Sequence, residues 1–245
     1  MLNYLRGIEL GELPPKTSYL YNLPVIKHLY ERERLEFDSP VTFLVGENGS
    51  GKSTLLEAIA VSVGFNPEGG GRNFTFETFG SHSELWKYLD TVKSILPEDG
   101  YFLRAESLYN LASNIDNLDE GRRWLINSYG GVSLHNQSHG ESFLSLVKNR
   151  LLGNGLYIFD EPEAALSPMR ILTLIAEIDR LVKCNSQIII ATHSPILLAY
   201  PNAEIIEISD KGIKKVNYTE TEHYLITKQF IENPERMIHY LLKGD

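Results

Sequence analysis

A glycine-rich segment over residues 46–54 constrains this chain more than any other feature of its sequence. It directly follows an apolar run at residues 41–45 and opens a stretch with a helical pattern. Glycines at 46, 49 and 51 allow a tight turn whose N–H groups, with the start of the next helix, face the β- and γ-phosphates of a nucleotide. The segment therefore predicts a phosphate-binding loop. Its predicted nucleotide contacts are Asn48, Gly49, Ser50, Gly51, Lys52, Ser53 and Thr54.

Two side chains of this loop have predicted roles of their own. Lys52 adds a positive point charge beside the phosphates, and Ser53 offers its hydroxyl to Mg²⁺. The pattern thus predicts a nucleoside triphosphate and Mg²⁺ as the bound cofactors.

Length and composition favour one well-packed domain over residues 1–245, because 42% of the residues are hydrophobic. The single cysteine, Cys184, has no partner for an internal disulfide, and we expect its side chain to be buried in the protein. Its presence as a lone thiol also implies a reducing compartment. No run of about 18 apolar residues is present, so we expect a cytoplasmic protein with no membrane segment of its own. A formal net charge of -9 argues against a surface that is basic overall, although a local basic patch stays open.

Apolar, strand-like runs alternate with amphipathic helices along the chain, which predicts an α/β fold with helices on both faces of a sheet. We expect the last residues, 217–245, to form two helices split at Asn233 and Pro234 that pack on the domain. The other predicted elements are two short strands within 35–45, a strand at 101–104, and helices at 51–63, 82–93 and 168–184, with further helical patterns over 106–127 and 143–152.

A second chemical landmark follows the apolar residues 156–159, where Asp160 and Glu161 stand before Pro162. An apolar run of this kind suits a strand buried on both faces of a parallel sheet, and such sheets bind ligands at the carboxyl ends of their strands. We predict that Asp160 holds Mg²⁺ and that Glu161 activates the water that attacks the γ-phosphate. The acidic pair on its own would fit a solvated turn, but together with the phosphate loop it indicates catalysis.

Another apolar run, at residues 187–191, delivers His193 to the end of a predicted strand, 33 residues after Asp160. The imidazole can donate a hydrogen bond to a γ-phosphate oxygen and help orient the attacking water. Ser194 is free to cap the following helix, so we predict that His193 acts as a catalytic sensor of the γ-phosphate.

The segment Ser138-His139-Gly140-Glu141 lies 22 positions before Asp160 and leads into an amphipathic run. At this spacing, the ordered set of phosphate loop, polar segment, Asp-Glu pair and histidine resembles the ABC-type ATPases, whose signature is usually Ser-Gly-Gly-Gln. In that family the signature serine and the helix that follows bind the γ-phosphate held by the opposite subunit. The resemblance implies an ATP-dependent homodimer in which Ser138, Gly140 and Glu141 contact the partner's ATP.

The resemblance implies a P-loop NTPase fold of the ABC type. We expect a mainly parallel central sheet, an antiparallel N-terminal β region, a helical lid over about 82–152 and a C-terminal helical extension. Two family motifs are altered. The glutamine expected after the strand at 101–104 is absent, and Glu106 is the predicted substitute near Mg²⁺. The aspartate of the D-loop is absent, where the sequence reads Ala164-Ala165-Leu166-Ser167.

These departures favour the soluble, SMC-like branch, which is related to DNA-repair ATPases and to ATPases of bacterial defence systems. The chain resembles a small stand-alone AAA-family ATPase without the coiled coil of SMC proteins, because only about 30 residues separate Glu106 from Ser138. We expect an ATPase switch that acts with nucleic acid. Two alternatives stay open, the ATP-binding subunit of an ABC transporter and a nucleotide-dependent scaffold for an effector protein.

Overall fold

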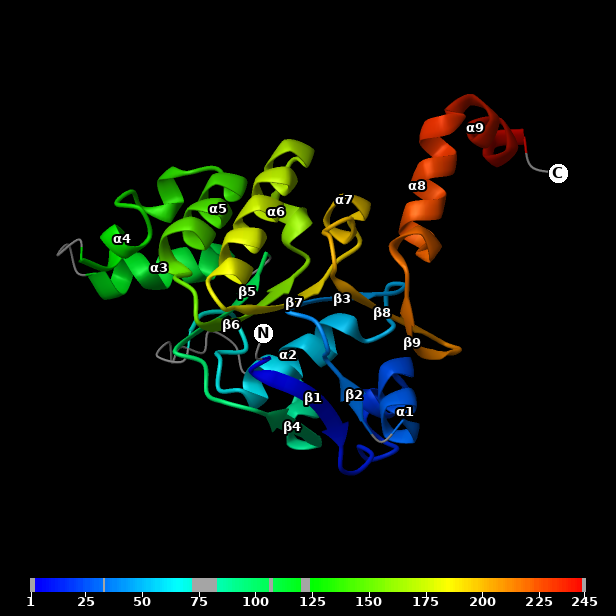
Figure 1. Ribbon diagram of the computed structural model, residues 1–245, viewed down its shortest axis with the longest axis horizontal. Coiled ribbons are helices and arrows are strands. Elements are labelled where there is room, and N and C mark those ends of the chain that lie inside the picture. The colour runs from blue at the N-terminus through cyan, green and yellow to red at the C-terminus, as the bar shows by residue number, and fades with distance from the viewer. Residues whose placement is uncertain (1–2, 33, 72–82, 106–107, 120–123, 244–245) are drawn as a thin grey trace.

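A six-stranded sheet forms the centre of the protein (Figure 1). The computed structural model describes residues 3–32, 34–71, 83–105, 108–119 and 124–243. The strand order is β5-β6-β7-β3-β8-β9, and neighbouring strands are parallel except for β8 and β9. The strands are β3 (Val41–Val45), β5 (Asp99–Arg104), β6 (Gly155–Asp160), β7 (Gln187–Ala191), β8 (Glu204–Ser209) and β9 (Gly212–Val216).

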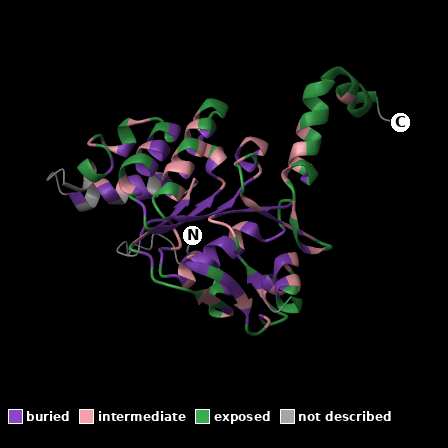
Figure 2. Cartoon of the chain, in the orientation of Figure 1, coloured by how far each residue is buried: buried purple, intermediate pink, exposed green. Residues whose placement is uncertain are grey.

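The middle strands are apolar because both of their faces are covered. Every residue of β3, β6 and β7 is buried, as the apolar runs at these positions predicted. Alternate side chains enter two hydrophobic cores, so that Phe43 and Leu44 of β3 lie on opposite faces of the sheet. Figure 2 shows the buried sheet between its two covering layers.

One face of the sheet is covered by helix α1 (Pro24–Glu31), helix α2 (Lys52–Ser62) and a separate antiparallel sheet. This smaller sheet has the order β2-β1-β4, with β1 (Leu5–Leu10) hydrogen-bonded to β2 (Leu35–Glu36) and β4 (Leu89–Lys93). The structure thus confirms both the mainly parallel central sheet and the antiparallel N-terminal β region.

The opposite face is covered by helices. They are α3 (Leu108–Asp119), α4 (Trp124–Ser128), α5 (His139–Arg150), α6 (Pro168–Lys183) and α7 (Pro195–Leu198), with the short 3-10 turns η3 (Leu134–Asn136) and η4 (Pro162–Ala165). Ser167 and Ser194 are the N-cap residues of α6 and α7, and this role was predicted for Ser194. The Ser194 hydroxyl accepts a hydrogen bond from the Leu197 N–H at 3.3 Å.

The predicted helix at 82–93 is wrong. Within its described part, residues 84–87 form the 3-10 turn η2 and residues 89–93 form strand β4. Along β4, buried Leu89 is followed by exposed Asp90, and all five residues pair with β1. Cross-strand hydrogen bonds outweigh the weak helical pattern here. Residues 84–87 and 89–93 of the expected helical lid thus form a 3-10 turn and a strand, and among the described residues that follow, the first α-helix begins at Leu108.

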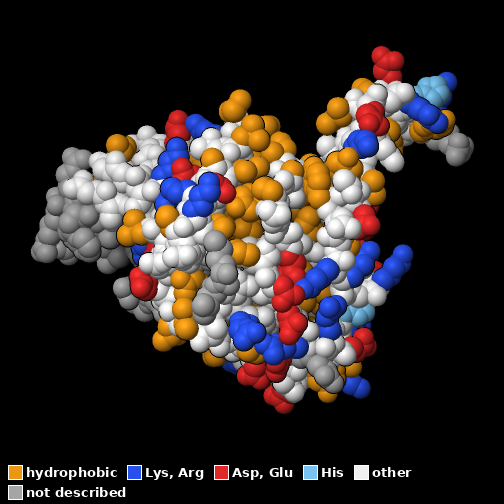
Figure 3. Space-filling view, in the orientation of Figure 1, with side chains coloured by type: hydrophobic (Ala, Val, Ile, Leu, Met, Phe, Trp, Pro, Cys, Tyr) orange, Lys and Arg blue, Asp and Glu red, His pale blue; other side chains and the backbone are white. Residues whose placement is uncertain are grey.

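The C-terminal extension has the predicted split but not the predicted packing. The 3-10 turn η5 (Tyr218–Glu220) leads into α8 (Glu222–Glu232), and α9 (Pro234–Lys243) follows Asn233. Neither helix contains a buried residue, and both stand away from the body of the protein (Figures 1 and 2). The expectation that they pack on the domain is therefore wrong. Figure 3 shows hydrophobic side chains exposed along both helices.

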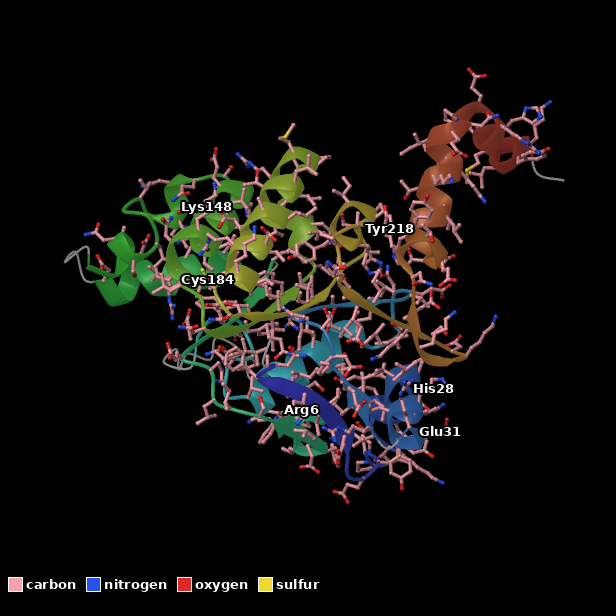
Figure 4. The ribbon with its side chains drawn as sticks, viewed as in Figure 1. Arg6, His28, Glu31, Lys148, Cys184 and Tyr218 are labelled. Atoms are coloured by element: carbon pink, nitrogen blue, oxygen red, sulfur yellow. The ribbon has the colours of Figure 1, made fainter. Side chains whose placement is uncertain are left out.

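Two further expectations concern the environment of the chain. Cys184 is exposed at the C-cap of α6, so its predicted burial is wrong (Figure 4). The amphipathic helix ends at Lys183, one residue before Cys184. Across the described residues, no helix is both long enough and apolar enough to cross a bilayer.

Candidate functional site

The predicted phosphate loop connects β3 to α2. Gly46, Gly49 and Gly51 all have positive φ angles, of 149°, 83° and 96°, which side-chain-bearing residues rarely adopt. A Cβ atom at Gly46 would lie 2.1 Å from the Ile208 carbonyl oxygen of β8. Glycine is thus required both for the turn and for the close approach of β8. Asn48 and Gly49 are exposed, whereas Ser50 and Gly51 are buried and Ser53 and Thr54 are half-buried at the start of α2.

Lys52 lies inside this loop. Its ammonium group donates hydrogen bonds to the carbonyl oxygens of Gly46 at 2.7 Å and Glu47 at 2.9 Å. Burial lowers the pKa of Lys52, and the negative charges of Glu161, Asp160 and Glu163 oppose that effect. The lysine charge is therefore directed to the point where the loop meets the carboxylates.

Asp160 lies at the carboxyl end of β6, in register with Arg104 of β5. One oxygen, Oδ2, accepts a hydrogen bond from Arg104 Nε at 3.1 Å, and Arg104 also forms an ion pair with Glu57 of α2 at 3.0 Å. Burial lowers the pKa of Arg104, but Asp160 and Glu57 outweigh it, and the net shift is upward. The second oxygen, Oδ1, is buried without a hydrogen-bond partner in the described structure. Sequence reasoning missed Arg104, which orients Asp160.

Glu161 follows in an unusual backbone conformation. Its φ and ψ angles of 47° and 54° are left-handed, which is uncommon for glutamate. The Glu161 N–H donates to the Ala191 carbonyl of β7 at 3.0 Å, which holds this conformation. Such strain concentrates at functional sites. The turn leaves the Glu161 side chain 42% exposed, with Oε1 3.6 Å from His193 Nε2.

His193 lies at the end of β7, between β6 and β3. Its backbone N–H donates to Glu163 Oε1 at 2.5 Å, and its ring Nδ1 lies 2.9 Å from Nε2 of His223, which belongs to α8. Burial lowers the pKa of His193 to about 4, and the positive charges of Lys52 and His223 act in the same direction. The imidazole is therefore neutral near pH 7. The contribution of His223 was not predicted, because nothing in the sequence links it to His193.

Two clefts meet at the phosphate loop. The larger, of about 670 Å³, lies between residues 46–50 and the β8–β9 hairpin at 207–214, and its volume suits a small-molecule ligand. The smaller, of about 340 Å³, is lined by residues 46–48, His193 and the first residues of α8.

Several buried polar atoms in the phosphate loop and at or just beyond the ends of β6 and β7 have no hydrogen-bond partner in the described part of the chain. They are Ser50 Oγ, Asp160 Oδ1, Glu163 Oε2 and His193 Nε2. Buried polar atoms are nearly always hydrogen-bonded, so a cluster of exceptions indicates a ligand, ion or water. A hydroxyl and an imidazole N–H fit phosphate oxygens, and a carboxylate fits a hydrated Mg²⁺. The residues present therefore fit the predicted cofactors.

The predicted metal ligands are only partly described. Ser53 and Asp160 belong to the loop and to β6, whereas Glu106 lies outside the described residues. Elsewhere in the described chain, no group of three or more His, Cys, Asp or Glu residues could hold a metal by itself. Mg²⁺ would depend on nucleotide phosphates together with Ser53 and Asp160, as is usual for this ion.

The predicted signature forms the N-terminus of α5. Ser138 is its N-cap, and Glu141 Oε2 accepts hydrogen bonds from the Ser138 N–H at 3.0 Å and the Ser138 hydroxyl at 2.7 Å. Gly140 is buried, and a Cβ atom there would lie 2.8 Å from the Ala165 carbonyl oxygen. Glycine at 140 therefore lets the helix tip approach the turn that follows Glu161.

Arg170 of α6 also reaches the helix tip, which the sequence did not predict. It donates to Ser138 Oγ at 3.0 Å and to Glu141 Oε1 at 2.9 Å. Hydrogen bonds from Ser138 lower the pKa of Glu141, and Arg170 adds to this effect. Ser138 and Glu141 are exposed, and neither lines the two clefts at the phosphate loop of the same chain.

Comparisons with known proteins agree with this arrangement. A family model described as "AAA domain" matches residues 26–97. A second, described as "AAA domain, putative AbiEii toxin, Type IV TA system", matches residues 142–199. The first match includes the phosphate loop, and the second includes Asp160, Glu161 and His193. No curated protein matches the sequence.

Solved structures share the fold. A chain of "a putative metal-chelate type ABC transporter" is 14% identical with a TM-score of 0.50, over 92% of this chain and 88% of that one. CbiO1 from Clostridium perfringens, part of the ABC transporter complex CbiONQ, is 20% identical with a TM-score of 0.49, over 97% and 99%. An SMC head domain from Thermotoga maritima is 16% identical with a TM-score of 0.43, over 87% and 98%. At identities this low, the similarity shows the fold alone. The fold assignment rests on the first neighbour, whose TM-score is 0.50.

A phosphate loop after β3, with a histidine at the end of the neighbouring strand β7 and an Asp-Glu pair at the end of β6 beyond it, defines a P-loop nucleotide-binding protein. Among P-loop proteins, the signature at the tip of α5 and the two AAA-domain matches indicate an ATPase-type domain. The chain therefore has a P-loop fold similar to that of the ABC-type ATPases. Proteins of this class use ATP and Mg²⁺.

Replacing Arg104 with Met should destabilise the fold strongly. The change would leave Asp160 and Glu57, whose side chains are only 6% and 11% exposed, without their shared cation. Removing one partner of a buried ion pair costs about 3–5 kcal/mol of unfolding free energy. Urea unfolding followed by circular dichroism measures this. Arg104→Lys, which keeps the charge, is the control and should lose less. A loss below about 1 kcal/mol for Arg104→Met would contradict the assigned role.

Proposed function

We propose that two copies of this chain bind ATP and Mg²⁺ between them, hydrolyse ATP and use the cycle as an association switch in a DNA-linked process such as repair, maintenance or defence. One observation carries the proposal. Ser138 and Glu141, at the tip of α5, are exposed and lie outside the clefts of their own phosphate loop. A motif that binds γ-phosphate in this class therefore has to serve a second copy, and each chain completes the site of the other.

Arg170 reduces the electrostatic repulsion between Glu141 and the partner's γ-phosphate in this arrangement. A carboxylate at position 141 would repel the partner's γ-phosphate, whereas the usual signature glutamine would not. Arg170 contacts both Ser138 and Glu141, so its guanidinium offsets the Glu141 charge and offers N–H donors at the helix tip. In our proposal Glu141 holds Ser138 and Arg170 in position, and these two contact the incoming phosphate.

The catalytic steps follow from the chain's own groups. Lys52 and the loop N–H groups hold the phosphates, and Ser53 and Asp160 would hold Mg²⁺, which when bound would neutralise phosphate charge. Glu161 accepts the proton of the attacking water, and neutral His193 donates its free Nε2–H to a γ-phosphate oxygen. Loss of the cleaved phosphate removes the anion shared by the two copies, so the dimer separates.

The nucleic-acid role is tested by turnover. We expect duplex DNA to raise the ATPase rate several-fold, because a ligand that favours the closed dimer raises the fraction of completed sites. Steady-state phosphate release, measured with duplex DNA, single-stranded DNA and RNA at fixed salt, gives the answer. Equal rates with and without all three nucleic acids would contradict a nucleic-acid role and leave ATP hydrolysis intact.

A transporter role is the second candidate, because the first structural neighbour is a chain of an ABC transporter. That role predicts co-purification with a membrane protein. The missing glutamine after the strand at 101–104, where Glu106 stands instead, argues against a transporter role. A nucleotide-dependent scaffold is the third. It predicts very slow turnover that rises only when an effector protein is present.

A further inference from the structure

The C-terminal extension reaches the nucleotide site through the first turns of α8, where one side chain contacts the sensor histidine directly. His223, in the first turn of α8, lies with Nε2 2.9 Å from His193 Nδ1, and the two ring centroids are 5.1 Å apart. The contact joins residues 30 positions apart in the sequence. It connects the sensor histidine to a pair of helices that otherwise stand away from the protein.

The hydrogen bond of this pair couples the tautomers of the two rings. A neutral imidazole has one N–H donor and one acceptor nitrogen. If His223 Nε2–H donates to His193 Nδ1, then His193 carries its proton on Nε2. That Nε2 is buried without a hydrogen-bond partner in the described structure and lies 3.6 Å from Glu161 Oε1. In this tautomer, the Nε2–H of His193 lies beside Glu161, at the carboxylate end of the site.

The attachment of α8 is concentrated at its base. Buried Thr221 donates its hydroxyl to the Tyr218 carbonyl oxygen at 2.8 Å, and the Tyr218 and Tyr224 rings meet edge to face at 4.7 Å (Figure 4 labels Tyr218). Beyond this base, α8 has no buried residue. Its first turns line the same cleft as residues 46–48 and His193. A small change at His193 is thus transmitted to a helix with few other restraints.

We propose that His223 is a positioning residue for His193, and that this pair makes the position of α8 and α9 depend on the γ-phosphate. The phosphate gives His193 Nε2 an anionic acceptor, which changes the direction and strength of its contact with His223. A ligand shifts a conformational equilibrium only through such differential contacts. The proposal rests on the proposed function in one respect, that ATP binds beside His193.

Two substitutions of similar size separate positioning from packing. His223→Phe keeps an aromatic ring without a hydrogen-bonding nitrogen, whereas His223→Gln keeps an amide donor near the place of Nε2. We expect His223→Phe to lower kcat roughly 10-fold with KM changed less than about 2-fold, and His223→Gln to recover most of that loss. Gln229→Ala, at an exposed position of α8, is the control and should match the wild type. Wild-type kcat in His223→Phe, or equal losses in both variants, would overturn the positioning role.

The coupling to α8 is measured by hydrogen–deuterium exchange in the slowly hydrolysing Glu161→Gln background. We expect peptides covering 222–232 to exchange differently with ATP and with ADP, and expect His223→Phe to abolish this difference while His223→Gln retains it. Identical exchange with both nucleotides, or a difference that persists in His223→Phe, would overturn the coupling. Binding of a fluorescent ATP analogue is measured in parallel. Absence of binding would refute the proposed function itself, whereas binding without a response in α8 would refute this inference alone.

Discussion

Glu161→Gln is expected to lower the ATPase rate by roughly 10² to 10⁴-fold while ATP binding persists. The substitution removes the group that accepts the water proton and keeps the size and shape of the side chain. The phosphate loop, Lys52 and Asp160 are unchanged by it, so the nucleotide still has its main contacts. ATP bound without hydrolysis should hold two copies together, and the variant should accumulate as a dimer.

Steady-state phosphate release measures the first effect, and sedimentation velocity with ATP and Mg²⁺ measures the second. Glu98→Gln is a matched control, because Glu98 is exposed and directly precedes β5 at the amino end of the parallel sheet, away from the phosphate loop. A Glu161→Gln variant that hydrolyses ATP at the wild-type rate would show that another group is the base. A variant that stays monomeric with bound ATP would refute the shared site.

The sequence predicted those features that local patterns encode. The runs that form β3, β6 and β7 are apolar because these strands are buried on both faces, and the functional side chains follow directly at their ends. Their order in space, β6-β7-β3, brings Asp160, His193 and the phosphate loop together at one edge of the sheet. The main site residues could therefore be predicted from the spacing of the motifs and from their positions at the ends of apolar strands.

The features that the sequence did not predict depend on long-range pairing. Arg104 meets Asp160 across 56 residues, and Arg170 meets Ser138 across 32. The local sequence around Arg104, Arg170 or His223 does not indicate which distant residue its side chain contacts. Strand β4 was mistaken for helix for the same reason, because it is stabilised by its pairing with β1. The exposed α8 and α9 show the reverse case, in which an apolar pattern does not ensure burial within the chain.

Mixing two inactive variants should restore activity if each site is built from two chains. Lys52→Ala removes the ammonium group of the phosphate loop and should weaken ATP binding roughly 100-fold, the scale of losing two charge-assisted hydrogen bonds. Ser138→Phe removes the hydroxyl at the exposed helix tip and blocks the approach of a phosphate. It also removes an N-cap, which costs about 1 kcal/mol, so thermal unfolding should confirm that the variant stays folded.

Each variant alone should lose nearly all turnover, because every site in a dimer of identical chains carries the same defect. In a mixed dimer, one site pairs the intact phosphate loop of the Ser138→Phe chain with the intact signature of the Lys52→Ala chain. Random pairing makes about half of the dimers mixed, each with one working site of two, so an equimolar mixture should recover about a quarter of wild-type activity. A site completed within one chain permits no such recovery, because no chain in the mixture has both motifs intact. Phosphate release from the mixture thus distinguishes a shared site from a self-contained one.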